Sequence, residues 1–351
     1  MPICVHRWAA SVLNREWDES LEQLAITCVA MEVPDTDEEK WWITQRRLLQ
    51  HAGRLERFIA AGKMKTTGME WALYRLGGLF AEQGMLAEAE AMLADAERMY
   101  TRALQGYQEA MGPKGPSTLD ILNNLGNLYK DQGKLAEAER MYIRALQGYE
   151  EALGSNHPST LSPINNLGLL YADQGKLAES EQMYIRALQG KEKALGPDHT
   201  STLDTVNNLG NLYADQGKLA EAEQMYIRAL QGKEKAPGPD HTSTLATVNN
   251  LGKLYAGQGK LADAEMMYTR ALQGYEGALG VQFMSSYLPA LRTIFRIGNL
   301  YSQTDRQELA KVMYTRALSG YTAVQGPSSK LCGEIEARLQ ALQITPAKVE
   351  T

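Results

Sequence analysis

The sequence has 351 residues, of which 42 are acidic and 36 are basic, giving a formal net charge of −6. It contains no long basic run, which argues against nucleic acid or an anionic membrane as a partner, and no apolar stretch of the roughly 18 residues that span a membrane. Three widely separated cysteines argue against a disulfide framework, and residues 1–15 show no signal peptide, so we expect a cytoplasmic protein.

The first 65 residues lack the repeat that fills the rest of the chain. They contain an apolar start at residues 3–13, then predicted helices near residues 18–31 and 37–60, separated by Pro34-Asp35. Proline disfavours a helix at the residue before it. We expect this region to form a helical cap on the repeats.

The centre of the chain repeats every 42 residues. A segment that begins at Asn123 recurs at Asn165, Asn207 and Asn249, and residues 165–206 match residues 207–248 at 38 of 42 positions. Divergent copies surround Gly77 and Gly298. A period of this length is typical of a solenoid, in which each unit buries its apolar face against its neighbours.

Each copy predicts a helical hairpin. In the second copy, Ser117 followed by Asp120 predicts a capping box, and Gly133 predicts the turn between two helices. Gly126 and Ala138 are small enough for the helices to approach closely. The apolar residues of the first helix recur at spacings of three and four, namely Leu119, Leu122, Leu125, Leu128 and Tyr129.

Two spacings are irregular. Gly77 and Gly126 are 49 residues apart, seven more than the period, and residues 85–91 resemble residues 92–98. Seven residues make about two helical turns, so this insertion predicts a longer second helix with its apolar face still inward. Four extra residues fall near 281–284, in a linker where added length costs little.

The repeat resembles the tetratricopeptide (TPR) superfamily, in the 42-residue form of kinesin light chains and of the sensor arrays of fungal NOD-like receptors. The family places Gly, Tyr, Ala, an aromatic residue and Ala at repeat positions 8, 11, 20, 24 and 27, and the second copy matches it with Gly126, Tyr129, Ala138, Tyr142 and Ala145. The third copy departs at Ser180 and the first at Leu93. The resemblance implies an all-α, right-handed superhelical solenoid of helical hairpins.

The residues on either side of the repeats also fit a TPR solenoid. Residues 330–343 predict a C-terminal capping helix, with Cys332, Ile335, Leu339 and Leu342 against the last repeat. Near the N-terminus, residues 5–9 with residues 45–49 and 51–52 resemble the junction between the NB-ARC module and the TPR array in fungal NOD-like receptors. Met1-Pro2 departs from the Met-His dipeptide of that junction.

These patterns predict three regions. We expect an N-terminal helical region at residues 1–65, six repeats within residues 66–328, and a capping helix with a tail at residues 329–351. The expected repeats run over residues 68–116, 117–158, 159–200, 201–242, 243–286 and 287–328, and are numbered one to six below.

No motif predicts catalysis, a cofactor or a metal. Gly133-Lys134 and its copies resemble a phosphate loop only superficially, because Leu follows each Lys and the required upstream glycine is absent. The linker residues His157, His199 and His241 would lie about one repeat, roughly 10 Å, apart, whereas zinc needs its ligands about 2 Å from one centre. We therefore expect no enzyme activity and no metal site.

Asparagine pairs are the sharper signal, because Asn is a poor residue for the middle of a helix. In TPR folds the first helix of each repeat lines the concave groove, and the pairs occupy positions 5 and 6, which face it. One interpretation is a ladder of carboxamides for a peptide main chain; the alternative is that one Asn of each pair staples neighbouring repeats. The predicted groove residues are Asn123, Asn124, Asn127, Lys130, Asn165, Asn166, Asn207, Asn208, Asn211, Asn249, Asn250 and Lys253.

Selectivity is expected from the other groove positions. Position 9 varies among Asn127, Leu169, Asn211 and Lys253. Repeats one and six replace the Asn pair by Tyr74-Arg75 and Phe295-Arg296, which either anchor acidic or aromatic ligand groups or pack against flanking helices. The cations at Lys130, Lys253, Arg292 and Arg296 are too dispersed to favour the carboxylate clamp of chaperone-binding TPR proteins.

The sequence therefore predicts non-catalytic recognition of a protein or extended peptide, with no nucleic acid, no membrane and a monomer favoured. The first hypothesis is the ligand-sensing domain of a fungal NOD-like receptor. The alternative is a free-standing adaptor similar to a kinesin light chain, although the coiled-coil heptads of that family are missing. An enzyme with its site in residues 1–65 is a third hypothesis that no cluster of residues supports.

Overall fold

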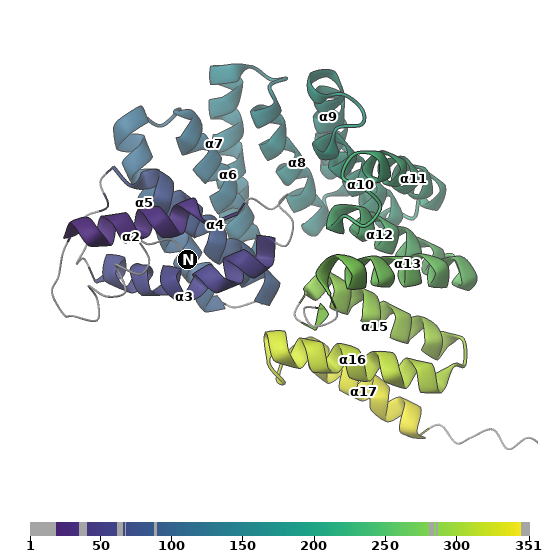
Figure 1. The fold of residues 1–351 in the computed structure, drawn as a ribbon. Coiled ribbons are helices and arrows are strands. Elements are labelled where there is room, and N and C mark those ends of the chain that lie inside the picture. The colour runs from purple at the N-terminus through teal and green to yellow at the C-terminus, as the bar shows by residue number, and fades with distance from the viewer. Residues whose placement is uncertain are drawn as a thin grey trace, which may run out of the picture. The chain divides into compact units, whose positions relative to one another are not determined.

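The computed structural model describes residues 19–34, 41–61, 66, 68–87, 90–280, 284–285 and 287–344. Within these ranges all regular structure is α-helical, which confirms the predicted all-α solenoid of helical hairpins (Figure 1). No helix among these residues is long and apolar enough to cross a membrane. The chain divides into two compact units, Met1–Asn166 (unit 1) and Leu167–Thr351 (unit 2).

Unit 1 holds the N-terminal helices and the first hairpins. Helices α2 and α3 pack on α4, and the pairs α4/α5 and α6/α7 form hairpins. The predicted helices of the N-terminal region correspond to α2 and α3, whereas the apolar start and the junction residues 5–9 lie outside the described residues. The helices of unit 1 are α2 (Glu19–Met31), α3 (Trp41–Ala60), α4 (Glu70–Ala87), α5 (Glu90–Met111), α6 (Pro116–Asp131), α7 (Leu135–Leu153) and the first part of α8 (Pro158–Asp173).

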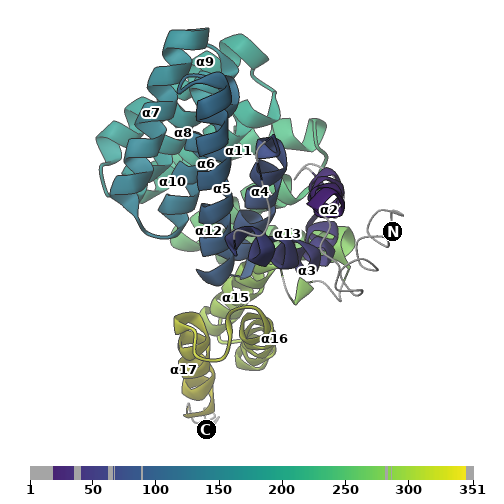
Figure 2. The ribbon, with the colours of Figure 1, turned by 90° about the vertical axis from the view of Figure 1, so that its left-hand side faces the viewer.

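Unit 2 continues the same pattern. The pairs α10/α11, α12/α13 and α15/α16 form hairpins, and α17 packs on α16, so that α15, α16 and α17 lie side by side (Figure 2). Besides the rest of α8, its helices are α9 (Leu177–Leu195), α10 (Thr200–Asp215), α11 (Leu219–Lys235), α12 (Thr242–Gly257), α13 (Leu261–Leu279), α15 (Leu288–Gln303), α16 (Gln307–Gln325) and α17 (Lys330–Ile344).

Close contact between the two helices of a hairpin depends on the glycine at position 8. A Cβ added at Gly126 would lie 2.5 Å from the ring of Tyr142, and Tyr142 is completely buried. Gly210 faces Tyr226 in the same way at 2.8 Å. The glycine and the tyrosine of the repeat pattern therefore form one packing unit, in which the ring fills the space that a side chain would take.

The predicted capping box at the start of α6 is wrong. Gly115 is the N-cap, without a side-chain hydrogen bond, and Pro116 takes the first helical position, where its missing N–H costs nothing. Ser117 therefore lies inside the helix, and Asp120 accepts a hydrogen bond from the hydroxyl of Tyr149 instead.

Histidines cap the corresponding helices of repeats four and five. The Nδ1 atom of His199 accepts a hydrogen bond from the N–H of Ser201 at 3.2 Å, and His241 accepts one from Ser243 at 3.2 Å. These bonds satisfy backbone donors that would otherwise be unpaired at the helix start. The linker histidines thus have a local structural role.

The seven-residue insertion of repeat one is shared between both helices, not confined to the second one as predicted. Helix α5 has 22 residues against 19 in α7, and α4 continues through Gly84 to Ala87, giving 18 residues against 16 in α6. A helix tolerates Gly84 because an interior glycine costs only about 1 kcal/mol. The smaller insertion at 281–284 lies almost entirely outside the described residues.

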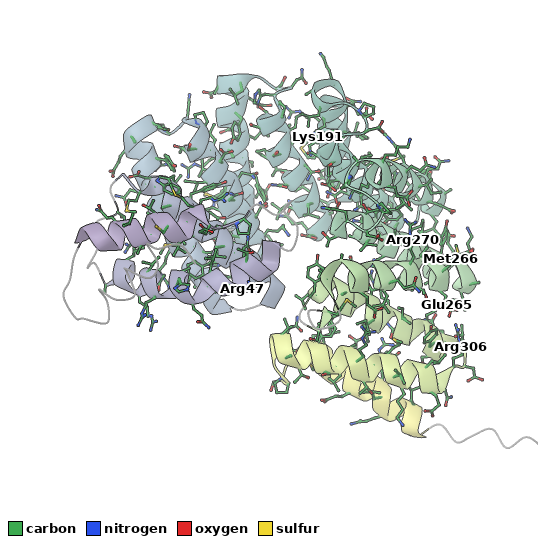
Figure 3. The ribbon with its side chains drawn as sticks, viewed as in Figure 1. Arg47, Lys191, Glu265, Met266, Arg270 and Arg306 are labelled. Atoms are coloured by element: carbon green, nitrogen blue, oxygen red, sulfur yellow. The ribbon has the colours of Figure 1, made fainter. Side chains whose placement is uncertain are left out.

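Ionic and aromatic contacts join successive repeats away from the Asn pairs. Lys218 lies 5.2 Å from the ring centroid of Tyr213 and 3.3 Å from Glu181 of the preceding repeat. In the last repeat Arg306 replaces the lysine, with both terminal guanidinium nitrogens 2.7 Å from the carboxylate oxygens of Glu265 (Figure 3).

The last helix, α17, covers the end of the array. Its residues Cys332 and Ile335 are completely buried, as expected for a capping helix.

Candidate functional site

The predicted carboxamides of unit 1 form hydrogen bonds between repeats. Nδ2 of Asn124 donates to the hydroxyl of Tyr74 at 2.9 Å, and Nδ2 of Asn166 donates to Oδ1 of Asn123 at 3.0 Å. Each bond joins the first helix of one repeat to the first helix of the repeat before it. Asn165 is half-buried beside Asn166.

The same pattern continues in unit 2. Asn250 donates to Oδ1 of Asn207 at 3.3 Å, and Asn249 accepts from the hydroxyl of Thr293 at 3.1 Å. These contacts match the stapling alternative. They do not use up the carboxamides, because each has two donor hydrogens and an acceptor oxygen with two lone pairs. A half-buried Asn can therefore hold a neighbouring repeat and still present polar atoms to a ligand.

Four of the predicted groove residues line a pocket within unit 2. The pocket, called the groove pocket below, has a volume of 480 Å³ and includes Asn208, Asn211, Asn250 and Lys253. The other lining residues come from α8 to α12 and are Leu169, Ala172, Asp173, Tyr184, Leu212, Ala214, Asp215, Leu219, Tyr226, Leu254 and Gly257.

The remaining predicted residues lie elsewhere. Asn207 and Asn249 directly precede the pocket residues Asn208 and Asn250 in the sequence but do not line the groove pocket themselves. Asn249 is only 8% exposed. Lys130 forms an ion pair with Asp131 at 2.9 Å. The predicted residues of unit 1, which do not line this pocket, are Asn123, Asn124, Asn127, Lys130, Asn165 and Asn166.

The residue at position 9 of the repeat determines whether the hydroxyl of a buried tyrosine has a hydrogen-bond acceptor. Oδ1 of Asn127 accepts from the hydroxyl of Tyr142 at 2.7 Å, and Asn211 accepts from Tyr226 at 2.7 Å. In repeat three this position is Leu169, so the hydroxyl of Tyr184 has no hydrogen-bond partner among the described residues, and burial raises its pKa. Tyr184 lines the groove pocket and can donate to a ligand there.

Charges are unevenly distributed along the groove pocket. Asp173 and Asp215 occupy position 13 of repeats three and four, and Gly257 replaces this aspartate in repeat five. Lys253, one helical turn before Gly257, is exposed and forms no ion pair with any described residue. The pocket therefore has acidic groups on α8 and α10 and a cation on α12.

Sequence reasoning missed the contribution of the second helices. Tyr184 and Tyr226 are conspicuous in the repeat as packing residues, but nothing in the one-dimensional pattern shows that they also border a pocket. Asp173 and Asp215 could have been found, because they stand at position 13, which faces the groove in the resembled family. Among the described residues, no group of three or more His, Cys, Asp or Glu is placed to hold a metal ion.

Comparison with known proteins identifies the family. A tetratricopeptide repeat model matches four overlapping segments, residues 68–151, 118–193, 159–235 and 201–277, and a second tetratricopeptide repeat model matches residues 291–319. The glycine–tyrosine packing and the consecutive hairpins described above are the structural counterpart of this match. The chain belongs to the tetratricopeptide repeat family.

Several solved structures share the fold at low sequence identity. BtubC from P. vanneervenii has a TM-score of 0.50 and 22% identity, covering 73% of this chain and 91% of that one. The apo form of the quorum sensor NprR from B. thuringiensis has a TM-score of 0.54 and 12% identity, covering 97% and 92%. A signal transduction ATPase with numerous domains and a tetratricopeptide repeat sensor, from Pyrococcus horikoshii, has a TM-score of 0.57 and 15% identity, covering 84% of this chain and 43% of that one. No curated protein matches the sequence.

Proposed function

We propose that this protein recognises an extended peptide, or an extended segment of a protein, in the groove pocket of unit 2, without catalysing a reaction. The observation that carries the proposal is the pocket itself, a 480 Å³ space in which Asn208, Asn211, Asn250 and Lys253 meet. Its volume falls within the range of roughly 300–1,000 Å³ that is typical of ligand sites.

The residues that line the groove pocket suit the main chain of a peptide ligand. Carboxamides both donate and accept, so they match the alternating N–H and C=O groups of an extended peptide. Leu169, Ala172, Leu212 and Ala214 add apolar surface between these polar groups, which provides room for ligand side chains. Selectivity then comes from the positions where the repeats differ, above all from Leu169 and Lys253.

The proposed biological setting is the ligand-sensing repeat domain of a fungal NOD-like receptor. Its support is the resemblance of the 42-residue repeat and the N-terminal region to such receptors; the Pyrococcus protein, which is similar in fold alone, also carries a repeat array described as a sensor. The alternative is a free-standing adaptor similar to a kinesin light chain. The gene decides between them: a nucleotide-binding module with a phosphate loop, upstream in the same reading frame, favours the receptor, and an upstream stop codon favours the adaptor.

Replacing Asn208 with Ala is expected to weaken peptide binding about fivefold, because one lost hydrogen bond costs on the order of 1 kcal/mol. The measurement is titration of the strongest binder from an array of random dodecapeptides. Gln224→Ala is the control, since Gln224 carries the same amide in the same repeat but is exposed on α11 and does not line the pocket. Unchanged affinity with a large drop in melting temperature would assign Asn208 to stapling alone.

A further inference from the structure

The hydroxyl of Tyr184 in α9 lacks the partner that the equivalent hydroxyl has in other repeats. In repeats two, four and six, this hydroxyl donates to Oδ1 of an asparagine at position 9, at 2.7, 2.7 and 2.8 Å. Position 9 of repeat three is Leu169, which packs beside Tyr184 and cannot accept a hydrogen bond, and none of the described residues supplies another acceptor. A buried hydroxyl without a partner is costly, so a ligand that brings an acceptor gains affinity there.

The same residue borders the groove pocket. Tyr184 is only 1% exposed, yet it lines the pocket. Tyr226 of repeat four also lines the pocket, but its hydroxyl is already bonded to Asn211. Tyr268, the equivalent residue of repeat five, does not line it. Within the described part of the chain, repeat three is therefore where a tyrosine hydroxyl without an acceptor meets the groove pocket.

Asp173 brings a carboxylate to this part of the pocket. It stands one helical turn after Leu169 on α8, so the two side chains share a helix face, and both line the groove pocket. Asp173 is exposed and forms no ion pair with any described residue. Burial and the charge of Asp173 raise the pKa of Tyr184, so the hydroxyl keeps its proton. Tyr184 thus offers a donor and Asp173 an acceptor to the same ligand group.

We propose that Leu169, Asp173 and Tyr184, called the amide subsite below, bind a carboxamide side chain, Asn or Gln, of the ligand peptide. The carboxamide oxygen accepts from the hydroxyl of Tyr184, and the carboxamide nitrogen donates to the carboxylate of Asp173. The ligand then supplies the group that Asn127 and Asn211 supply within repeats two and four. The inference rests on the proposed function and adds a side-chain preference to it.

Charged and apolar side chains suit this arrangement less well. A ligand carboxylate would accept from Tyr184 but would be repelled by Asp173. A ligand ammonium would suit Asp173, but it has no acceptor for the hydroxyl of Tyr184. An apolar side chain would leave both groups without a partner.

The test screens the array of random dodecapeptides against the full chain and three variants. Tyr184→Phe removes the donor, and Leu169→Asn gives the hydroxyl the internal acceptor that repeats two and four have. Tyr314→Phe is the matched control, because that hydroxyl is bonded to Asn299 at 2.8 Å and Tyr314 does not line the groove pocket. The best peptide is then titrated beside an analogue in which Leu replaces its carboxamide residue.

The expected result is enrichment of Asn or Gln at one peptide position, with about tenfold weaker binding of the Leu analogue to the unmodified chain. In Tyr184→Phe and Leu169→Asn the two peptides should differ by less than about threefold, whereas Tyr314→Phe should keep the full difference. Enrichment of other residue types, no enrichment, or a difference that persists in both pocket variants would overturn the amide subsite and leave the proposed function standing. An array on which nothing binds would overturn both.

Thermal unfolding measures the state of the hydroxyl without a ligand. Tyr314→Phe removes a hydrogen-bonded hydroxyl and should lower the melting temperature by about 1–3 °C. Tyr184→Phe removes a hydroxyl that has no partner, so its melting temperature should stay unchanged or rise. Equal losses in the two variants would show that the hydroxyl of Tyr184 is already satisfied in the free protein, and would overturn the amide subsite.

Discussion

Replacing Lys191 with Met is expected to raise the free energy of unfolding near neutral pH by about 1–2 kcal/mol. Lys191 of α9 is only 4% exposed (Figure 3), and burial lowers its pKa from 10.5 to about 8. A shift of this size corresponds to roughly 3 kcal/mol. The lost hydrogen bonds from Nζ to the carbonyl of Ser201 and the hydroxyl of Thr205, at 3.2 and 3.0 Å, offset part of that gain.

The same substitution is expected to remove a pH dependence. Because the pKa of Lys191 is lower in the folded protein than in the unfolded chain, the unfolded chain binds more protons between pH 8 and pH 10.5. Stability therefore rises with pH across this window. Above about pH 10 the tyrosines with raised pKa values act in the opposite sense, for example the half-buried Tyr255, whose pKa partial burial and Glu223 raise to about 12. The folded protein keeps these protons longer than the unfolded chain does, so stability falls with pH there.

Chemical denaturation at intervals from pH 7.5 to 9.5 measures both effects. The unmodified protein should gain stability over this range, and Lys191→Met should start higher and gain less. Lys193→Met is the control, because Lys193 is exposed on the same helix and its replacement should change neither quantity. A variant that is less stable than the unmodified protein at pH 7.5, or that keeps the full pH dependence, would show that the buried ammonium is not a net cost.

Two glycines of the α12/α13 hairpin are expected to respond to alanine with opposite signs. A Cβ at Gly252 would lie 2.8 Å from two ring atoms of Tyr268, which is 3% exposed and has little room to move. Overpacking costs typically 1–3 kcal/mol, so Gly252→Ala should destabilise the protein by about 1–2 kcal/mol after its gain in helix propensity.

Gly277 is the matched case. It lies within α13 with no atom near the position of an added Cβ, so Gly277→Ala should stabilise the protein by about 0.5–1 kcal/mol through helix propensity alone. Thermal unfolding of both variants measures the difference. Equal effects of the two substitutions would contradict the view that glycine at position 8 is required by the tyrosine ring.

The repeat made much of the fold predictable. Gly126 and Tyr142 recur at fixed spacing, so their contact could be expected from the family pattern and was found. The start of α6 was predicted wrongly because local signals competed, and Pro116 at the first helical position excluded Ser117 as the cap. The prediction that the insertion in repeat one lengthens only the second helix was wrong because either helix of a hairpin can take up extra turns without losing its apolar face.

The site was less predictable, because it depends on what neighbouring repeats bring together. The Asn pairs were visible, but only the structure shows that Asn250 both bonds to Asn207 and lines the groove pocket. The burial of Lys191 has a signal in the sequence, since it stands where repeats two and five have Tyr149 and Tyr275. The repeat alignment does not show that a lysine at this position remains buried.

The central claim, recognition of a peptide in the groove pocket, is tested most directly by filling the pocket. Ala214→Trp introduces a large ring at a lining position, while Ala194→Trp introduces the same ring at an exposed position of α9 outside the pocket. The measurement is calorimetric titration of the strongest array peptide into each variant. We predict at least tenfold weaker binding to Ala214→Trp, with an unchanged melting temperature, and unaltered binding to Ala194→Trp; equal affinity of both variants would contradict the groove pocket as the binding site.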